Sequence, residues 1–230
     1  MTSLRTVVYV DGFNLYFGCL KRKRRYRWLD VCALANRLCR DQDPAAKIVS
    51  VKYFTAPVKA KLSPRGDSSC IAQQDYWLAL KAHCSNLEII EGQFFTVSGS
   101  YHEDHADGTI DFQTKLRVIR PEEKQTDVNI ALHMLADATD ELCDQQVLLS
   151  NDSDCMPALR MIRQRHPSLQ LGVVAPILAG GQGRRQPSKL FRDYVDWVRS
   201  TIAEIDLAAC QLPKSVPTRK RKICKPAHWE

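Results

Sequence analysis

Acidic side chains stand directly after two short apolar segments that have the composition of buried strands. Asp11 follows the run 6–10 (TVVYV), and Asp152 and Asp154 follow the run 147–150 (VLLS). In an open parallel α/β sheet, the loops at the carboxyl ends of the strands meet at one crevice. We therefore expect these three carboxylates to lie close together.

Two further residues fit the same crevice. Asp127 stands at the start of a helix that we expect Thr126 to cap, and Asn14 follows Asp11 by three residues. Crowded carboxylates repel one another unless a cation offsets their charge. Hard oxygen ligands favour Mg²⁺ or Mn²⁺ over zinc, and such an ion can activate water and neutralise charge on a phosphodiester. A helix cap or a turn is the simpler explanation for any one of these residues alone.

The elements that must hold these residues alternate between strands and helices. This alternation predicts an α/β fold with a central, mostly parallel sheet covered by helices on both faces. Residues 93–125 follow neither period, and we expect a hairpin or an extended excursion there. We expect strands at 6–10, 48–55, 87–95, 147–150 and 171–175, and helices at 29–40, 68–83, 126–142, 155–165 and 188–202.

The net charge of +7 is concentrated in two places. The run 21–27 (KRKRRYR) has six positive charges, and the segment 208–230 has six more against Glu230 alone, which leaves 21 basic and 25 acidic residues elsewhere. An acidic body with two basic runs suggests a polyanion partner. We expect the following side chains to contact nucleic acid: Lys21, Arg22, Lys23, Arg24, Arg25, Lys124, Arg184 and Arg185.

Composition predicts one folded domain over residues 1–207 and a basic, disordered tail over 208–230, which holds three prolines. The nine cysteines are odd in number and lack a CxxC pair, so we expect buried, reduced thiols. The start of the chain lacks the pattern of a secretory signal, and no apolar run is long enough to span a bilayer. We therefore expect a cytoplasmic protein with no membrane partner.

Three segments, in this order, resemble the NYN family of PIN-like ribonucleases, in its LabA-like branch. They are VVYVDGFNLYFG at 7–18, KQTDVNIALHML at 124–135 and LLSNDSDCMPALRMIR at 148–163. The chain departs from the family at three places that flank the carboxylates, where it has Thr126, Asn151 and Cys155.

The resemblance implies a Rossmann-like PIN fold that binds Mg²⁺ or Mn²⁺ and hydrolyses RNA. Asp11, Asp127 and Asp152 would hold the metal, Asp154 would complete the site or orient water, and Asn14 would position an oxygen atom. The function predicted from the sequence is a metal-dependent endoribonuclease that acts on single-stranded or structured RNA.

Two alternatives stay open at this point. A non-catalytic RNA-binding regulatory module would explain the basic runs and the altered residues beside the carboxylates. A metal-dependent phosphatase for small phosphoesters would use the same acidic site. The basic tail could bind RNA or a protein partner, and a homodimer is also compatible with the sequence.

Overall fold

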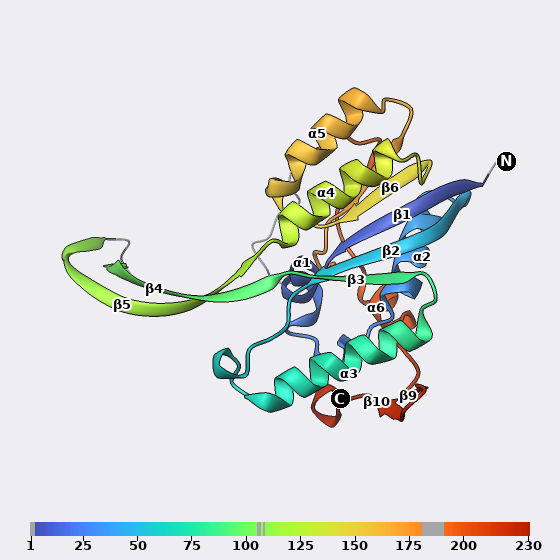
Figure 1. Cartoon of the computed structure of the whole chain (residues 1–230). Helices are drawn as coiled ribbons and strands as arrows, with labels where there is room; N and C mark the ends of the chain where they lie inside the picture. The colour runs from blue at the N-terminus through green and yellow to red at the C-terminus, as the bar shows by residue number, and fades with distance from the viewer. Residues whose placement is uncertain (1–2, 105–106, 108, 181–190) are drawn as a thin grey trace.

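A six-stranded sheet in the order β3-β2-β1-β6-β7-β8 forms the centre of the molecule, and all its neighbouring strands pair in parallel (Figure 1). The computed structural model describes residues 3–104, 107, 109–180 and 191–230. The strands of the sheet are β1 (Leu4–Asp11), β2 (Ala46–Thr55), β3 (Leu87–Glu91), β6 (Gln145–Leu149), β7 (Gln170–Val174) and β8 (Trp197–Arg199).

Helices cover both faces of this sheet, as Figure 1 shows, with α4 and α5 on one face and α2, α3 and α6 on the other. No helix in the described part of the chain is long and apolar enough to cross a membrane. The α-helices are α1 (Gly12–Leu15), α2 (Val31–Gln42), α3 (Asp67–His83), α4 (Thr126–Thr139), α5 (Met156–Arg165) and α6 (Glu204–Ala209). The shorter turns are η1 (Tyr16–Leu20), η2 (Arg24–Tyr26), η3 (Ala60–Leu62), η4 (Ser153–Cys155) and η6 (Ala227–Trp229).

The side chains of β1 alternate between two hydrophobic cores. Val7 and Tyr9 pack with the residues of α4 and α5, whereas Val8 and Val10 pack with those of α2 and α3. Because a parallel strand in the middle of such a sheet is buried on both faces, its sequence is continuously apolar rather than alternating. The prediction of an α/β fold with a parallel sheet covered on both faces is confirmed.

One predicted helix is wrong. The described part of the segment 188–202, which begins at Phe191, contains the short strand β8, and β8 pairs in parallel with β7. Trp197 and Val198 pack against the cores as partly buried residues. The apolar spacing that suggested a helix instead belongs to a short strand at the edge of the sheet.

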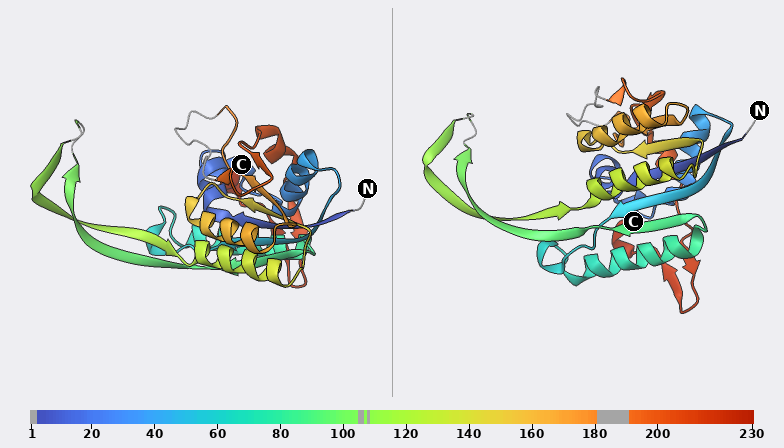
Figure 2. Two further views of the ribbon diagram at one scale, coloured as in Figure 1. Left: turned by 90° about the horizontal axis from the view of Figure 1, so that it is seen from above. Right: turned by 45° about the horizontal axis from the view of Figure 1, so that its top comes forward.

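A long antiparallel hairpin interrupts the alternation of strands and helices. It consists of β4 (Gln93–Asp104) and β5 (Ile110–Lys124), and both views in Figure 2 show it projecting away from the body. The expectation of a hairpin or an extended excursion over 93–125 is confirmed. Gln125 has a left-handed φ of 83° and turns the chain from β5 into α4.

The structure differs from the expectation of a disordered tail over 208–230. This segment forms the small antiparallel pair β9 (Ser215–Pro217) and β10 (Lys222–Cys224), and Val216 and Ile223 are buried in the core beside α2 and α3. The indole N–H of Trp28 also donates to the Pro213 carbonyl at 2.8 Å. The prolines break helices, but they are compatible with these short strands and turns.

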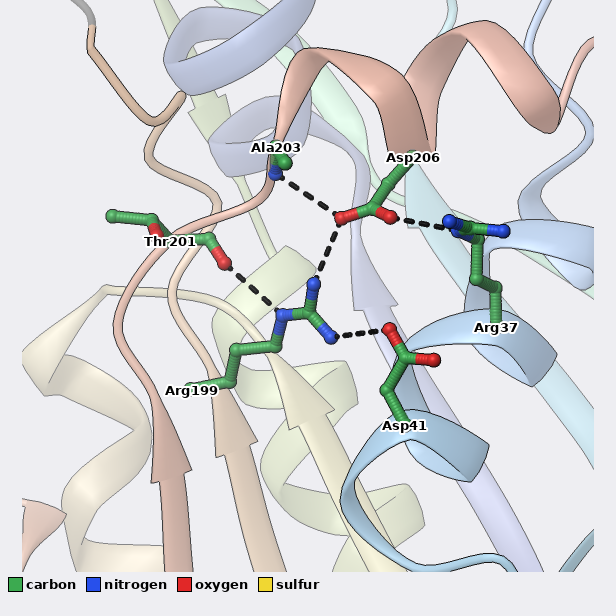
Figure 3. A network of polar contacts seen from close by, with 6 residues as sticks. All are labelled: Arg37, Asp41, Arg199, Thr201, Ala203 and Asp206. Atoms are coloured by element: carbon green, nitrogen blue, oxygen red, sulfur yellow. Dashed lines mark hydrogen bonds and ion pairs between the residues drawn. The ribbon is translucent and has the colours of Figure 1, made fainter.

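A buried carboxylate attaches the C-terminal part of the chain to the sheet and to α2 (Figure 3). Asp206 accepts from Arg37 Nε at 2.7 Å and from Arg199 at 2.8 Å, and the main-chain N–H of Ala203 donates to it at 3.2 Å. Arg199 also pairs with Asp41 at 3.0 Å. The charge of a fully buried carboxylate is thus met by two guanidinium groups, as burial of a charge requires.

Candidate functional site

Asp11 is the last residue of β1 and lies buried at the carboxyl edge of the sheet, with 3% of its surface exposed. Its Oδ1 accepts from the main-chain N–H of Asn14 at 2.8 Å, and its Oδ2 accepts from the Ser150 hydroxyl at 2.8 Å. The carboxylate therefore caps α1 and also joins β1 to the segment that follows β6. Both of its oxygens are fixed in direction.

The chain can turn into α1 directly after Asp11 because the next residue is Gly12. A Cβ atom at this position would lie 2.7 Å from the Phe54 carbonyl oxygen and 2.9 Å from the Tyr53 ring. The absence of a side chain thus lets the start of α1 pack closely against β2. This close packing keeps Asp11 at the edge of the sheet.

The loop after β6 brings the second pair of predicted carboxylates to the same edge. Ser150 Oγ accepts from the main-chain N–H of Asp152 at 3.0 Å, and Asp152 Oδ1 accepts from that of Asp154 at 3.1 Å. Asn14 is buried, and its Oδ1 accepts from the Asn151 N–H at 3.4 Å. Asp152 is half-buried and Asp154 is exposed.

Asp127, in the first turn of α4, lies within electrostatic range of these carboxylates. Burial raises its pKa to about 6, and the charges of Asp11, Asp152 and Glu123 act in the same direction. Burial also raises the pKa of Asp11, with a further contribution from Asp152. The structure therefore brings the predicted carboxylates and Asn14 together at one edge of the sheet. We use the name acidic pocket for this cluster of side chains, which consists of Asp11, Asn14, Asp127, Asp152 and Asp154.

The carboxylates of the acidic pocket are neighbours, but they do not form a tight cage. Within the described part of the chain, no three of them bring oxygen atoms within 4.8 Å of one another. Mg²⁺ keeps several waters and is usually bound through one or two carboxylates, so its binding does not need such a cage. The geometry is therefore compatible with an ion held partly through water.

Sequence reasoning missed two residues of this region, Ser150 and Glu123. Glu123 accepts from both the main-chain N–H and the hydroxyl of Thr126, and it adds negative charge beside Asp127. The predicted capping role of Thr126 is wrong, because Thr126 is the first residue of α4 and Gln125 takes the cap position without a side-chain bond. The position of Ser150, a polar residue directly after the apolar run of β6, could have indicated its role from the sequence.

The residues expected to contact RNA fall into three groups. Lys23 and Arg25 are ion-paired with Glu204, which also accepts from the Tyr26 hydroxyl at 3.0 Å. Lys21, Arg22, Arg24 and Lys124 are exposed, and Lys124 lies 3.7 Å from Glu122. Arg184 and Arg185 lie outside the described residues. Contact with RNA stays a prediction for this set.

Comparisons with family models and with solved structures define no family. No protein-family model matches the chain. A crystal structure of a protein of unknown function from Vibrio parahaemolyticus aligns with 89% of this chain and 98% of its own, at a TM-score of 0.44 and 15% identity. A likeness of this strength carries no argument about fold or function.

A curated relative overturns the predicted activity. The chain is 37% identical over 243 aligned positions to 6-hydroxy-3-succinoylpyridine 3-monooxygenase HspA from Pseudomonas putida. The alignment covers 98% of this chain and 75% of the relative. A monooxygenase is an oxidoreductase, so this relative contradicts the predicted assignment as a ribonuclease, nuclease or hydrolase. The coarser expectation that the protein is an enzyme agrees with the relative. With identity of this extent over nearly its whole length, the chain belongs to the family of the monooxygenase HspA.

Proposed function

We propose that this protein is a monooxygenase that acts on a small aromatic substrate of the kind that the name of HspA describes, a hydroxylated pyridine with an acidic side chain. The observation that carries the proposal is the 37% identity over 98% of the chain. The reaction attaches one oxygen atom of O₂ to a ring carbon of the substrate and reduces the other to water. A reduced nicotinamide donor supplies two electrons and one proton as hydride, and one further proton is taken up from solution.

We assign the reaction to the acidic pocket. The pocket lies at the carboxyl ends of β1 and β6, where the chain order of the sheet changes direction, and ligands of open α/β sheets bind at such a switch point. Its oxygen donors suit the two ions expected from the sequence, Mg²⁺ and Mn²⁺. Of the two, Mn²⁺ can change oxidation state, so it fits oxygen chemistry better. When bound, this ion would supply charge neutralisation and an electron-transfer centre.

A flavin or another dinucleotide does not fit the first turn of this sheet. In dinucleotide-binding folds the pyrophosphate lies at the N-terminus of the helix after the first strand, beside a glycine-rich turn. Here the Asp11 carboxylate accepts from the N–H of Asn14 in that turn, and the sequence DGFN has no glycine-rich pattern. Asp127 and Asp152 would add repulsion to a bare pyrophosphate. We therefore do not place the pyrophosphate of a flavin or of the nicotinamide donor at this turn.

The side chains of the pocket have separate tasks in this proposal. Asp127 is the proton-transfer residue in this proposal, because it is half-buried and lies beside the charges of Asp11 and Asp152, which favour its protonated form. The Ser150 hydroxyl and the Asn14 N–H each donate to one oxygen of Asp11. These two hydrogen bonds hold the Asp11 carboxylate in one orientation at the edge of the sheet. Asp152 is half-buried, its main-chain N–H donates to Ser150 Oγ and its Oδ1 accepts from the Asp154 N–H, so it would contribute the second directed carboxylate.

We also propose that the chain has the NYN form of the PIN-like fold. The three segments that resemble this family cover the β1–α1, β5–α4 and β6–α5 junctions, and these junctions supply all the residues of the acidic pocket. This proposal concerns ancestry and architecture. It is independent of the activity, which follows HspA.

The test measures oxygen consumption by the purified full chain. The assay contains 6-hydroxy-3-succinoylpyridine, NADH and either Mn²⁺, Mg²⁺ or a chelator. We expect substrate-dependent oxygen uptake that Mn²⁺ supports and the chelator abolishes. Asp127→Asn and Asp152→Asn should lower the rate at least a hundredfold, in the range seen for lost acid–base groups.

Asp140→Asn is the matched control. Asp140 is the C-cap of α4, at the end of the helix opposite Asp127, and is not part of the acidic pocket. It should keep the full rate. If Asp127→Asn and Asp152→Asn consume oxygen as fast as the unaltered protein, the reaction does not take place at the acidic pocket. No uptake with any ion would refute the proposed activity.

A further inference from the structure

A second cluster of ligating side chains lies outside the acidic pocket. Asp30 directly precedes α2, Cys32 lies in the first turn of α2, and Cys84 directly follows α3. Each offers one ligand atom, and these atoms all lie within 4.8 Å of one another. Asp30 and Cys84 are buried and Cys32 is half-buried, so the cluster is a defined site rather than a patch of surface residues.

The spacing within the cluster is compatible with ligands on one metal ion. The Cys84 thiol donates to Asp30 Oδ1 at 3.4 Å. Zinc–sulfur and zinc–oxygen bonds in a tetrahedral site put two such ligand atoms about 3.6 Å apart. Two thiolates and one carboxylate form a donor set that zinc accepts, whereas Mg²⁺ prefers oxygen alone.

Hydrogen bonds hold the ligand atoms of the cluster in place. Asp30 accepts from the main-chain N–H groups of Cys32 at 3.0 Å and Ala33 at 2.9 Å, which fixes its carboxylate as the cap of α2. Neither cysteine forms a disulfide. Both sulfur atoms are therefore free to lose a proton and bind a divalent ion as thiolates.

We propose that Asp30, Cys32 and Cys84 form a zinc site. The fourth position is taken by water, since Asp30 and Cys32 also line a surface cleft of about 580 Å³. His83 is a positioning residue, because its Nε2 lies 3.2 Å from Asp30 Oδ2 and restrains the carboxylate from the side of α3. The site joins the start of α2 to the end of α3, so the metal would link two helices on the same face of the sheet.

The test uses Co²⁺ as a spectroscopic probe of the full chain, reduced and freed of metal. Cobalt bound to thiolate has a sulfur-to-metal charge-transfer band that carboxylate-bound cobalt lacks. We expect this band to saturate at one equivalent and to disappear on addition of Zn²⁺. Cys32→Ser and Cys84→Ser should each abolish it, and His83→Gln should weaken the affinity roughly tenfold, as loss of an outer-shell partner does.

Two variants serve as controls. Cys143→Ser alters a buried cysteine of the other hydrophobic core, and Asp152→Asn alters the acidic pocket. Both should keep the charge-transfer band, and the second separates this site from the proposed catalytic ion. If circular dichroism shows that Cys84→Ser does not fold, Cys32→Ser is the variant that decides, because Cys32 is only half-buried. A folded, reduced protein without the band, or a band that persists in Cys32→Ser, would overturn the proposal.

Discussion

The Ser150 hydroxyl donates to Asp11 Oδ2 at 2.8 Å and connects the segment after β6 to the end of β1. The same oxygen atom of Ser150 accepts from the Asp152 N–H at 3.0 Å. The Ser150 side chain thus orients the Asp11 carboxylate and also holds the main chain at Asp152. Removing it should affect both the stability of the fold and the binding properties of the acidic pocket.

Ser150→Ala should therefore destabilise the protein by about 2 kcal/mol, the usual range for losing a hydrogen bond to a charged group. The loss should be larger at pH 8 than at pH 4, because the hydroxyl stabilises the charged form of Asp11 against the effect of its burial. Urea denaturation at the two pH values measures this difference. Ser153→Ala, an exposed serine of the same loop, is the control and should change little. Equal effects of the two variants would contradict the role of Ser150.

Asp127→Asn should raise the free energy of unfolding near neutral pH. The folded protein raises the pKa of Asp127 from 3.8 to about 6, so ionisation above that value costs stability, and the cost is absent below the unfolded pKa. Because Asp127 is partly exposed, solvent screening reduces the expected gain to about 1 kcal/mol. Chemical denaturation in chelator at pH 7.5 and pH 3.5 checks the sign. A gain that is the same at both pH values would show that the cause is not titration of Asp127.

Gly12→Ala should destabilise the fold by roughly 1–3 kcal/mol through overpacking, because the new Cβ would meet the Phe54 carbonyl oxygen. The backbone atom cannot rotate away as a flexible side chain would. Thermal unfolding followed by circular dichroism measures the loss. Gly66→Ala has no atom within 4 Å of its Cβ, so its loss, roughly 1–3 kcal/mol, should come from its positive φ of 53° alone. An unchanged melting temperature for Gly12→Ala would show that the start of α1 and β2 are less closely packed at this edge.

Removing residues 208–230 should unfold the domain or destabilise it severely. Leu212, Val216 and Ile223 are each at most 4% exposed, and burying each such side chain contributes about 2 kcal/mol. Their joint loss approaches the whole stability of an ordinary domain. Denaturation of the truncated chain measures the effect. A truncated protein with unchanged stability would restore the expectation of a disordered tail.

The sequence predicts the sheet well because each central strand, such as the β1 segment with Val7 and Val10, is a continuous apolar run that only a parallel sheet buries. It also predicts which carboxylates gather at one edge, since Asp11 and Asp152 directly follow such runs. It does not predict the packing of Val216, because the short strands around it gain their stability from distant parts of the chain. The cluster of Cys32 and Cys84 is equally invisible in the sequence, since its members meet only through the packing of two helices.

The activity could not be derived from the acidic residues alone. The same oxygen-rich pocket at the end of β1 is compatible with hydrolysis and with oxygen chemistry, because both can use a divalent ion held by carboxylates. The relationship to HspA favours oxygen chemistry and is the basis of the proposed function. Residue types thus suggest a kind of ion but do not specify the reaction.

The most direct test of the proposed monooxygenase is the fate of isotopically labelled dioxygen. The full chain is incubated with 6-hydroxy-3-succinoylpyridine, NADH, Mn²⁺ and labelled O₂, and the products are analysed by mass spectrometry. The account predicts one labelled oxygen atom per molecule of product and no label when Asp152→Asn replaces the unaltered protein. Product whose new oxygen comes from water, or no oxidised product at all, would contradict it.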